Sequence, residues 1–236
     1  MGLLDGQLAL VTGASKGIGA ATARALAAQG AHVVLVARSA RELEAVEESI
    51  HAGGGSATIA PVDLAQPDGI ARLATAINER WKGLDILVIN AAVLPVLTPV
   101  WQIEQIDLNR ALMLNVVATQ ALIAAFHPML KASKDARVIG VTSSVGAKPR
   151  AFWGAYGSTK AAFDNLLDCY AQEVANTTAI RVAILDPGAT RTAMRAKAYP
   201  GEDPASVKPP ETVAQHITAL VGKQFASPHR ERVNQF

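Results

Sequence analysis

The stretch Leu8-Ala9-Leu10-Val11-Thr12-Gly13-Ala14-Ser15-Lys16-Gly17-Ile18-Gly19 decides the fold. Its first four residues form a short apolar run, which is typical of a strand buried on both faces of a parallel sheet. The glycine-rich turn leads into the alanine-rich segment 20–29, which favours a helix and is followed by the helix-ending signal Gly30. A second apolar strand follows over residues 31–37, so the stretch opens a βαβ unit.

The same alternation of strands and helices continues along the chain. We expect helices over residues 41–50, 67–81, 103–126 and 156–176, with Pro67 near the start of the second and Pro128 marking the end of the third. Further strands are expected over residues 57–62, 84–89, 137–141 and 180–185, and residues 232–236 could form a short last strand. Six strands alternating with helices predict an α/β fold: a doubly wound parallel sheet of the Rossmann type, in three α/β/α layers and one domain over residues 1–236.

Composition narrows the class of protein. The chain has 236 residues, half of them hydrophobic, which is enough for one well-buried domain. The net charge of +2, without a Lys/Arg run, argues against a nucleic acid or an anionic membrane as partner. The N-terminus lacks a signal-peptide pattern and no apolar run reaches membrane-spanning length, so we expect a cytoplasmic protein. The one cysteine, Cys169, is expected to be a buried structural thiol, and no metal site is expected.

Polar residues stand at or just past the expected strand ends. They are Thr12, Arg38, Asp63, Asn90, Ser143 and Asp186. Any one of them could simply begin a polar loop. Because the carboxyl ends of parallel strands meet at one edge, where doubly wound sheets bind ligands, the six together predict a binding site there.

The glycine turn is the first candidate for that site. The pattern Gly13-x-x-x-Gly17-x-Gly19, between a buried strand and a helix, allows a tight turn and close backbone approach to a phosphate. The helix that begins near Gly17 presents free N–H groups and the positive end of its dipole to an anion. A bare glycine turn is the alternative, but its context favours a nucleotide site.

The residues after the second strand select the nucleotide. An acidic residue there would bond the ribose 2′-hydroxyl of NAD, whereas this chain has Arg38, and a cation suits the 2′-phosphate of NADP. Lys16 adds a second positive charge in the glycine turn, and Ser15 adds a hydroxyl. Ordinary solvated surface charge is the alternative for both cations. Together they favour NADP(H) over NAD(H).

Tyr156 and Lys160 are the candidate catalytic pair. Residues four apart lie on the same face of a helix, so the phenol and the ammonium can approach one another. A neighbouring cation favours the phenolate and would lower the pKa of Tyr156, as a general acid/base near neutral pH requires. Taken alone, such a pair is more often a packed ring and a solvated charge.

Together these motifs resemble the compact type of the short-chain dehydrogenase/reductase family, from about Leu4 to Val221. The resemblance rests on motifs in order along the chain: Thr12-Gly13-x3-Gly17-x-Gly19, Asn90-Ala91-Ala92, Asn115, Ser143, Tyr156-x3-Lys160 and Pro187-Gly188. It implies an NADP(H)-dependent oxidoreductase that moves hydride between the nicotinamide and a carbonyl or secondary alcohol carbon. The usual Asn-Asn-Ala-Gly motif is replaced here by Ile89-Asn90-Ala91-Ala92, and the usual C-terminal strand is not recognisable.

The resemblance also implies a role for each matching residue. Tyr156 would be the general acid/base, Lys160 would tune it and hold the nicotinamide ribose, Ser143 would orient the carbonyl and Asn115 would hold a water beside Lys160. Ser144 is the alternative to Ser143, but the family spacing of 13 to the tyrosine favours Ser143. The expected cofactor contacts are Gly13, Ser15, Lys16, Gly17, Ile18, Gly19, Arg38, Asp63, Leu64, Asn90, Ala91, Tyr156, Lys160, Pro187, Gly188, Thr190 and Thr192.

The remaining expectations concern the substrate and partners. Residues 193–208 lack clear periodicity and are expected to form a mobile lid. An apolar pocket could be lined by Val93, Leu94, Val145, Trp153, Met194 and Tyr199, which suits a small apolar carbonyl or alcohol substrate. A homodimer or homotetramer is expected. The alternatives are a non-catalytic NADP-binding regulator on the same fold and an epimerase or dehydratase of the longer family type, which would need an added C-terminal domain.

Overall fold

A parallel sheet forms the centre of the molecule. The computed structural model describes residues 2–66 and 68–234, and these form a sheet of seven strands in the order β3-β2-β1-β4-β5-β6-β7. Every neighbouring pair is parallel. The strands are β1 (Leu8–Thr12), β2 (His32–Ala37), β3 (Ser56–Pro61), β4 (Ile86–Ile89), β5 (Arg137–Val141), β6 (Arg181–Asp186) and β7 (His229–Arg232).

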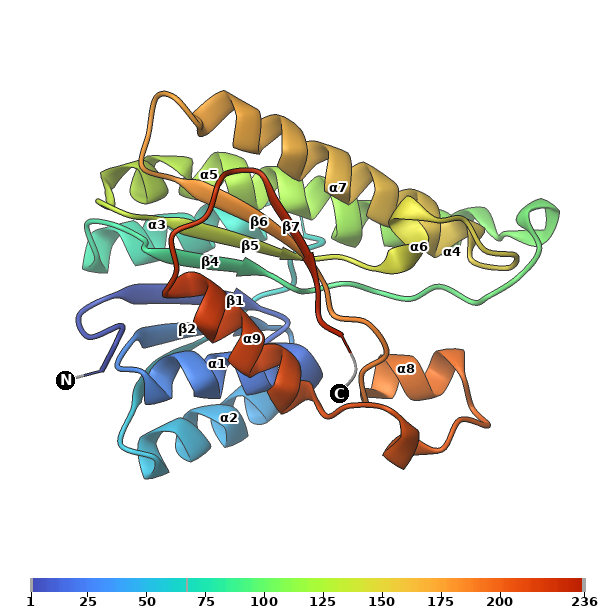
Figure 1. Cartoon of the computed structure of the whole chain (residues 1–236), viewed down its shortest axis with the longest axis horizontal. Helices are drawn as coiled ribbons and strands as arrows, with labels where there is room; N and C mark the ends of the chain where they lie inside the picture. The colour runs from blue at the N-terminus through green and yellow to red at the C-terminus, as the bar shows by residue number, and fades with distance from the viewer. Residues whose placement is uncertain (1, 67, 235–236) are drawn as a thin grey trace.

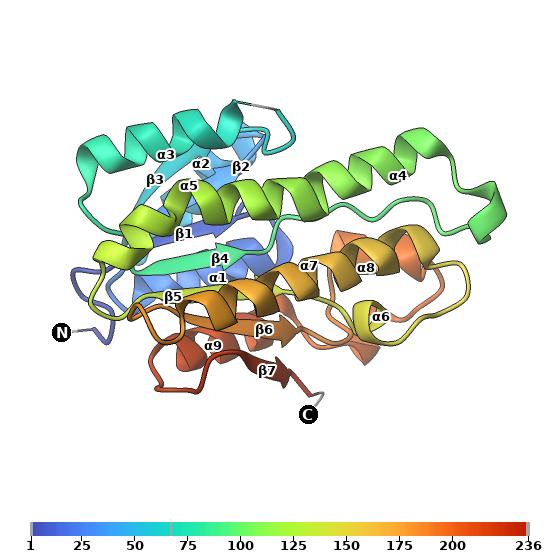
Figure 2. The same cartoon turned by 90° about the horizontal axis from the view of Figure 1, so that it is seen from above.

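Helices cover both faces of this sheet (Figures 1 and 2). The face with α1, α2 and α9 buries Leu26, Val46 and Ile217, and the face with α3, α5 and α7 buries Leu73, Phe126 and Leu167. The structure thus confirms the expected doubly wound α/β fold. The helices are α1 (Gly17–Ala28), α2 (Ala40–Ala52), α3 (Gly69–Arg80), α4 (Gln105–Leu112), α5 (Ala118–Ala132), α6 (Ser144–Ala147), α7 (Gly154–Val174), α8 (Ala193–Ala198) and α9 (Pro210–Val221), with short turns η1 (Val100–Gln102) and η3 (Pro204–Ser206).

The strand order places the crevice for a ligand. It reverses between β1 and β4, which pair through Val11 and Val88 while β2 lies on the other side of β1. The segments that follow β1 and β4 therefore diverge toward opposite faces of the sheet. A doubly wound sheet binds its ligand in the opening at such a point.

The helix expected to end at Pro128 continues to Ala132. Proline removes one backbone donor and crowds the carbonyl four residues earlier, that of Ala124. Both Pro128 and Ala124 lie on the exposed side of α5, where water can satisfy that carbonyl.

The C-terminal end and Cys169 also differ from expectation. The last strand is His229–Arg232, earlier than expected, with residues 235–236 outside the described part; Pro67 lies outside it too. Cys169 is exposed, so the expectation of a buried thiol is wrong. Residues next to one another in a helix point about 100° apart, so the apolar neighbours of Cys169 say little about its own face.

One helical run is longer than its sequence suggests. The helices α4 and α5 are joined by η2 (Met113–Val117), a π-helical segment, into one run over Gln105–Ala132. By length and composition alone this run could cross a membrane, which corrects the expectation that no segment is long and apolar enough. Its residues Leu122, Phe126 and Met129 pack against the sheet, as in the core helix of a globular domain.

Candidate functional site

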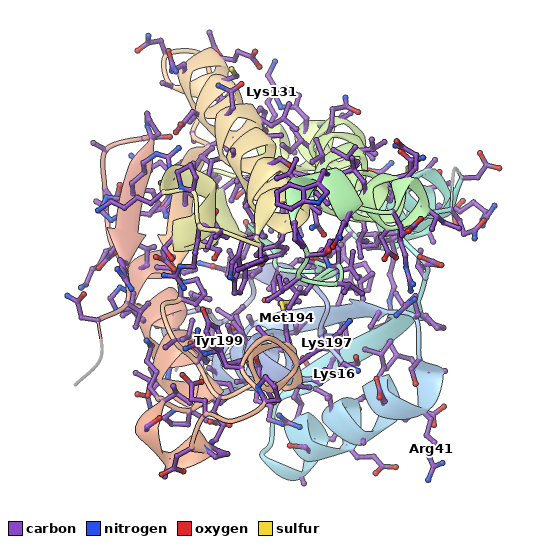
Figure 3. The ribbon with its side chains drawn as sticks, turned by 90° about the vertical axis from the view of Figure 1, so that its right-hand side faces the viewer. Lys16, Arg41, Lys131, Met194, Lys197 and Tyr199 are labelled. Atoms are coloured by element: carbon purple, nitrogen blue, oxygen red, sulfur yellow. The ribbon has the colours of Figure 1, made fainter. Side chains whose placement is uncertain are left out.

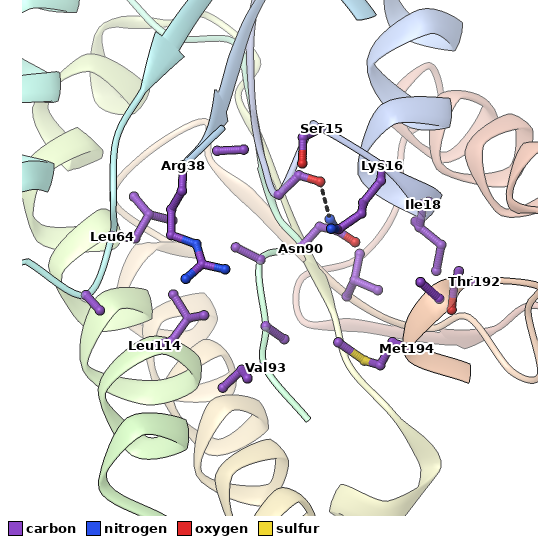
Figure 4. A pocket seen from close by; sticks show the side chains of 18 of the residues that line it. Ser15, Lys16, Ile18, Arg38, Leu64, Asn90, Val93, Leu114, Thr192 and Met194 are labelled. Carbon is purple, nitrogen blue, oxygen red and sulfur yellow. Dashed lines mark hydrogen bonds between the residues drawn. The ribbon is translucent and has the colours of Figure 1, made fainter. Parts of the chain in front are cut away.

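A cavity of about 830 Å³ opens at the carboxyl ends of the strands, where the strand order reverses. Figure 4 shows Arg38 on one side of it, Lys16 and Ile18 on the other, and Asn90 between them. Most of the expected cofactor contacts line this cavity: Gly13, Ser15, Lys16, Gly17, Ile18, Arg38, Asp63, Leu64, Asn90, Ala91, Tyr156, Lys160, Pro187 and Thr192.

The glycine turn has the geometry that its sequence predicts. Gly13 and Gly17 both have positive φ, +66° and +56°, a conformation that other residues rarely adopt. Gly19 lies so close to the turn that an added Cβ would stand 2.2 Å from the carbonyl oxygen of Gly13. The three glycines thus serve the turn and its packing against α1.

The side chain of Asn90 braces the same turn. Its Nδ2 donates to the carbonyl oxygen of Thr12 at 2.9 Å, while its backbone N–H donates to Thr12 Oγ1 at 2.9 Å. The Thr12 hydroxyl in turn donates to the carbonyl oxygen of Val88 at 3.1 Å. These bonds fix the ends of β1 and β4 relative to one another, so Asn90 shapes the cavity as well as lining it.

The start of α1 is free to bind an anion. Its first turn contains no acidic residue and Lys16 at the N-cap makes no side-chain capping bond, so its first N–H groups keep their bonding capacity. Lys16 Nζ lies 3.8 Å from Glu42 Oε1, and both side chains are largely exposed, so this contact holds the lysine weakly. Arg38 also reaches the cavity, and the described residues place no carboxylate within ion-pair distance of it.

The far end of the cavity is formed by the residues after β3. Asp63 Oδ1 accepts a hydrogen bond from the backbone N–H of Ala65 at 3.0 Å, which shapes the turn. Leu64 is buried beside it. A nucleotide base could pack against the leucine side chain and donate a hydrogen bond from its amino group to the carboxylate.

Tyr156 and Lys160 lie together on the wall formed by α7. Both are buried, at 6% and 2% exposure, and Lys160 Nζ lies 6.0 Å from the centroid of the Tyr156 ring. Lys160 Nζ donates to the carbonyl oxygen of Val141 at 2.8 Å. Burial lowers the pKa of Lys160 to about 8. Burial raises the pKa of Tyr156, and the negative charges of Asp186 and Asp164 raise it further. The expectation that Lys160 lowers this pKa is therefore wrong.

Asn115 lies in the π-helical segment η2 and is buried. Its Oδ1 accepts from the backbone N–H of Val93 at 2.9 Å, and its Nδ2 donates to Val93 O at 3.1 Å and to Thr159 Oγ1 at 3.0 Å. The turn of a π-helix is wider than that of an α-helix, and here it directs the Asn115 amide toward the loop after β4 and toward α7. Asn115 therefore ties the loop after β4 to the helix that carries Lys160.

Besides Asn115, four of the expected site residues do not line the cavity. They are Gly19, Ser143, Gly188 and Thr190. Ser143 lines a neighbouring hollow instead. The hydroxyl of Thr190 donates to the carbonyl oxygens of Pro187 and Gly188, at 3.1 and 3.3 Å, and so stabilises its own turn. Thr192 lines the cavity but also caps α8 by accepting from the backbone N–H of Arg195 at 3.1 Å.

An apolar cluster packs around Tyr156. Leu94, Val145 and Tyr156 form its buried centre, with Trp153 packed against it. The rings of Trp153 and Tyr156 are 6.0 Å apart, and those of Trp153 and Tyr199 are 5.8 Å apart. Four of the six residues expected to line an apolar pocket, Leu94, Val145, Trp153 and Tyr199, therefore meet beside the tyrosine, whereas Val93 and Met194 line the main cavity.

Residues 193–208 include the helices α8 and η3 in place of the irregular segment expected. Met194 lines the main cavity, and Figure 3 shows it with Lys197 and Tyr199 on this segment. Arg150 Nη1 donates to the Tyr199 hydroxyl at 2.6 Å, which joins the segment to the loop before α7. Through Met194 the segment lines the cavity, and through Tyr199 it contacts the ring of Trp153 beside Tyr156.

Several residues of the lining escaped the sequence analysis. Some of these residues are neighbours, in the strands and loops, of residues that were expected at the site. Arg110 and Leu114 reach the cavity from α4 and the π-helical segment, and the sequence contains no signal that would identify them. Ser39 could have been found, because it caps α2 with its hydroxyl directly after Arg38. The additional lining residues are Ala37, Ser39, Glu42, Val62, Ala65, Ala92, Arg110, Leu114, Val141, Thr142 and Ala193. Val93 and Met194 also line the cavity, and both were expected as residues of the apolar pocket.

The fold and this cavity define a class: doubly wound α/β proteins with a ligand site at the reversal of strand order. Comparison with known proteins gives the family. Residues 7–203 match the family model described as short chain dehydrogenase. An uncharacterized oxidoreductase, YciK of Escherichia coli, is 35% identical over 223 residues, which are 93% of this chain and 88% of that protein. The chain therefore belongs to the short chain dehydrogenase family of oxidoreductases.

Solved structures agree with this assignment. A protein from Pseudomonas syringae, described as a short chain dehydrogenase, superposes with a TM-score of 0.94 at 39% identity, covering 98% of this chain and 96% of that one. A family member from Escherichia coli, solved in complex with NADPH, gives a TM-score of 0.91 at 32% identity, covering 99% and 98%.

Proposed function

We propose that this protein is an NADP(H)-dependent oxidoreductase that transfers hydride between the nicotinamide and a carbonyl or secondary alcohol carbon. The observation that carries the proposal is one cavity that is lined by the glycine turn, Arg38, Tyr156 and Lys160 together. We also propose a single NADP-binding domain, a lid over residues 190–208 and a cytoplasmic location.

The residues of the cavity fit a dinucleotide phosphate. The glycine turn leaves no room for side chains where a pyrophosphate would approach, and the uncapped start of α1 offers N–H groups to it. Arg38, Ser39 and Lys16 would hold the 2′-phosphate, and Asp63 with Leu64 would hold the adenine. A relative solved in complex with NADPH supports the same choice.

When bound, the reduced nicotinamide would supply the hydride. Tyr156 would donate its proton to the substrate oxygen, because its phenol lies on the cavity wall and stays protonated near neutral pH. Lys160 would hold the nicotinamide ribose and Pro187 would line the ring. We propose that Ser143 orients the carbonyl oxygen, which requires its side chain to turn from the neighbouring hollow toward Tyr156.

The substrate is proposed to be a small apolar ketone, aldehyde or secondary alcohol, because Leu94, Val145 and Trp153 surround the approach to Tyr156. The test is to mix the protein with NADPH and a panel of ketones and to follow the absorbance of the reduced nicotinamide. Consumption of NADPH that depends on a ketone supports the proposal. NADPH binding with no consumption across the panel would instead favour the non-catalytic regulator.

Removal of Arg38 tests the cofactor choice. We expect Arg38→Ala to weaken NADPH binding about thirtyfold, because a charge-assisted bond to phosphate contributes about 2 kcal/mol. NADH lacks the 2′-phosphate, so its affinity should stay close to the wild-type value. Fluorescence titration with both nucleotides measures the two Kd values. The matched control is Arg41→Ala, one helical turn along; equal weakening of NADPH and NADH in Arg38→Ala would place the 2′-phosphate elsewhere.

We further propose a homo-oligomer formed through the helical run 105–132. Ile106, Met113 and Val117 are exposed on one face of this run, and Trp101 just before it is 84% exposed. Exposed apolar surface of this kind marks interaction sites. Pairing of this face with a second copy would give the dimer, and a tetramer would need a second contact.

Introducing a charge on this face should separate the subunits. We expect Trp101→Glu to shift the molar mass measured by size-exclusion chromatography with light scattering toward that of one chain, because a buried unpaired carboxylate disfavours association. Leu3→Glu, at another exposed apolar position near the N-terminus, should leave the mass unchanged. An unchanged mass for Trp101→Glu would contradict an interface at this face.

A further inference from the structure

A second hollow lies behind the tyrosine wall. It has a volume of about 280 Å³, is open to solvent and is lined by Thr142, Ser143, Asp164, Asp186 and residues of the edge strand β7. Thr142 lines this hollow and the main cavity. The two spaces therefore share a wall residue at the end of β5, next to Val141, whose carbonyl oxygen accepts from Lys160.

Polar atoms without partners gather in this hollow. Among the residues that the structure describes, four buried side-chain polar atoms lack a hydrogen-bond partner, and two of them are Thr142 Oγ1 and Asp164 Oδ1. Asp164 is only 7% exposed. A buried carboxylate oxygen without a partner is costly, so it calls for a charge or a solvent contact that offsets it.

Arg230 of β7 satisfies this carboxylate only in part. Its Nη1 lies 3.3 Å from Asp164 Oδ2, while its Nη2 bonds Asp168. Its side chain is about half exposed, which weakens both ion pairs. Asp164 therefore keeps negative charge that this arginine does not neutralise.

Lys160 is a second cation whose charge Asp164 influences, although its Nζ lies beyond ion-pair distance of that carboxylate. It lies one helical turn earlier on α7, on the same face, and its only hydrogen bond among the described residues goes to the neutral carbonyl of Val141. Burial lowers the pKa of Lys160 and the charge of Asp164 opposes that change. Burial raises the pKa of Asp164, and the neighbouring Thr142 hydroxyl, Arg230 and Lys160 oppose that rise. The other charged groups at the hollow are Asp186, Glu231 and Arg232.

We propose that Asp164 is a positioning residue whose carboxylate is the counter-charge that holds Lys160 as an ammonium ion, with the second hollow as its contact with solvent. Arg230 competes for the same carboxylate, so the edge strand β7 sets how much of this charge acts on Lys160. The consequence for turnover rests on the proposed function, whereas the pairing of Asp164 with Lys160 does not.

The pairing is tested without turnover by NMR titration of the lysine Nζ signals in ¹⁵N-lysine-labelled protein, with Lys160→Arg identifying the signal. In Asp164→Asn, Lys160 should titrate about one pH unit lower, because it loses a nearby opposite charge. In Arg230→Gln it should titrate higher, because a competing cation is gone. Asp168→Asn is the matched control, since Asp168 also pairs with Arg230 but lies a further turn from Lys160.

A purely structural role predicts a different result. Asp164→Asn and Arg230→Gln break the same ion pair, so they would then lower the thermal stability alike and leave Lys160 unchanged. An unmoved Lys160 in Asp164→Asn, or shifts of the same sign in both variants, would overturn the proposal. If Asp164→Asn does not fold, Arg230→Gln decides alone: an upward shift supports the pairing and no shift overturns it.

The pH profile of ketone reduction gives the functional readout. Loss of the Asp164 charge lowers the pKa of both Lys160 and Tyr156, so the alkaline fall in rate should move to lower pH in Asp164→Asn. A shifted Lys160 signal with an unshifted rate profile would overturn the positioning role. A wild-type protein that reduces no ketone would overturn the proposed function instead, and the NMR result would still decide the pairing.

Discussion

Replacement of Tyr156 by phenylalanine is expected to lower kcat for ketone reduction about a thousandfold, which is within the usual contribution of a general acid. The substitution removes only the hydroxyl. The ring keeps its contacts with Trp153 and the apolar cluster, so the fold and the affinity for NADPH should stay close to wild type. Single-turnover measurements with saturating NADPH give the chemical rate, and fluorescence titration gives the Kd.

Tyr170→Phe is the matched control for this experiment. Tyr170 lies on the same helix and is equally buried, and its hydroxyl is 3.0 Å from His127 Nδ1, away from the main cavity. Its loss should reduce stability slightly and leave turnover intact. If Tyr156→Phe retained turnover, Tyr156 would be rejected as the proton donor, and Ser143 would be the next candidate for that role.

The raised pKa of Tyr156 bears on its role in the reaction. A phenol that stays protonated at neutral pH can give a proton to a developing alkoxide, which is the step that reduction needs. Oxidation of an alcohol would need the phenolate as a base, and burial disfavours that form. The environment that the chain itself gives Tyr156 therefore supports its proposed role as the proton donor in carbonyl reduction.

The fold and the rim of the site were predictable because their signals are local. Continuous apolar runs mark strands that are buried on both faces, and the glycine turn marks the first crossover. Once the strands are known to be parallel, their ends must share an edge. This is why Arg38, Asp63 and Asn90, far apart in sequence, could be assigned to one cavity.

The missed features depend on burial and on tertiary contacts. The strand β7 reads His-Arg-Glu-Arg and carries no apolar pattern, because its charges bond Asp164, Asp168 and His216 instead. The pKa of Tyr156 could not be inferred from its spacing to Lys160, because the spacing gives the neighbour but not the depth of burial. The position of Ser143 depends on the turn into α6, which the sequence does not specify.

Replacement of Gly19 by alanine should disable the dinucleotide site. The new Cβ would stand 2.2 Å from the carbonyl oxygen of Gly13 and 2.6 Å from Asn90 Nδ2, so α1 would have to move away from the turn. Overpacking of this kind costs up to about 3 kcal/mol, which corresponds to about a hundredfold loss of affinity for NADPH. Calorimetric titration measures the affinity, and thermal unfolding reports the strain on the fold.

Gly201→Ala separates this effect from the general cost of replacing a glycine. Nothing lies within 4 Å of a Cβ added at Gly201, so both its Tm and its Kd for NADPH should match wild type. Because Gly19 touches the turn through backbone atoms, no side-chain rearrangement can relieve the clash. Wild-type affinity for NADPH in Gly19→Ala would therefore mean that the nucleotide does not bind at the glycine turn, and the cavity would need a different ligand.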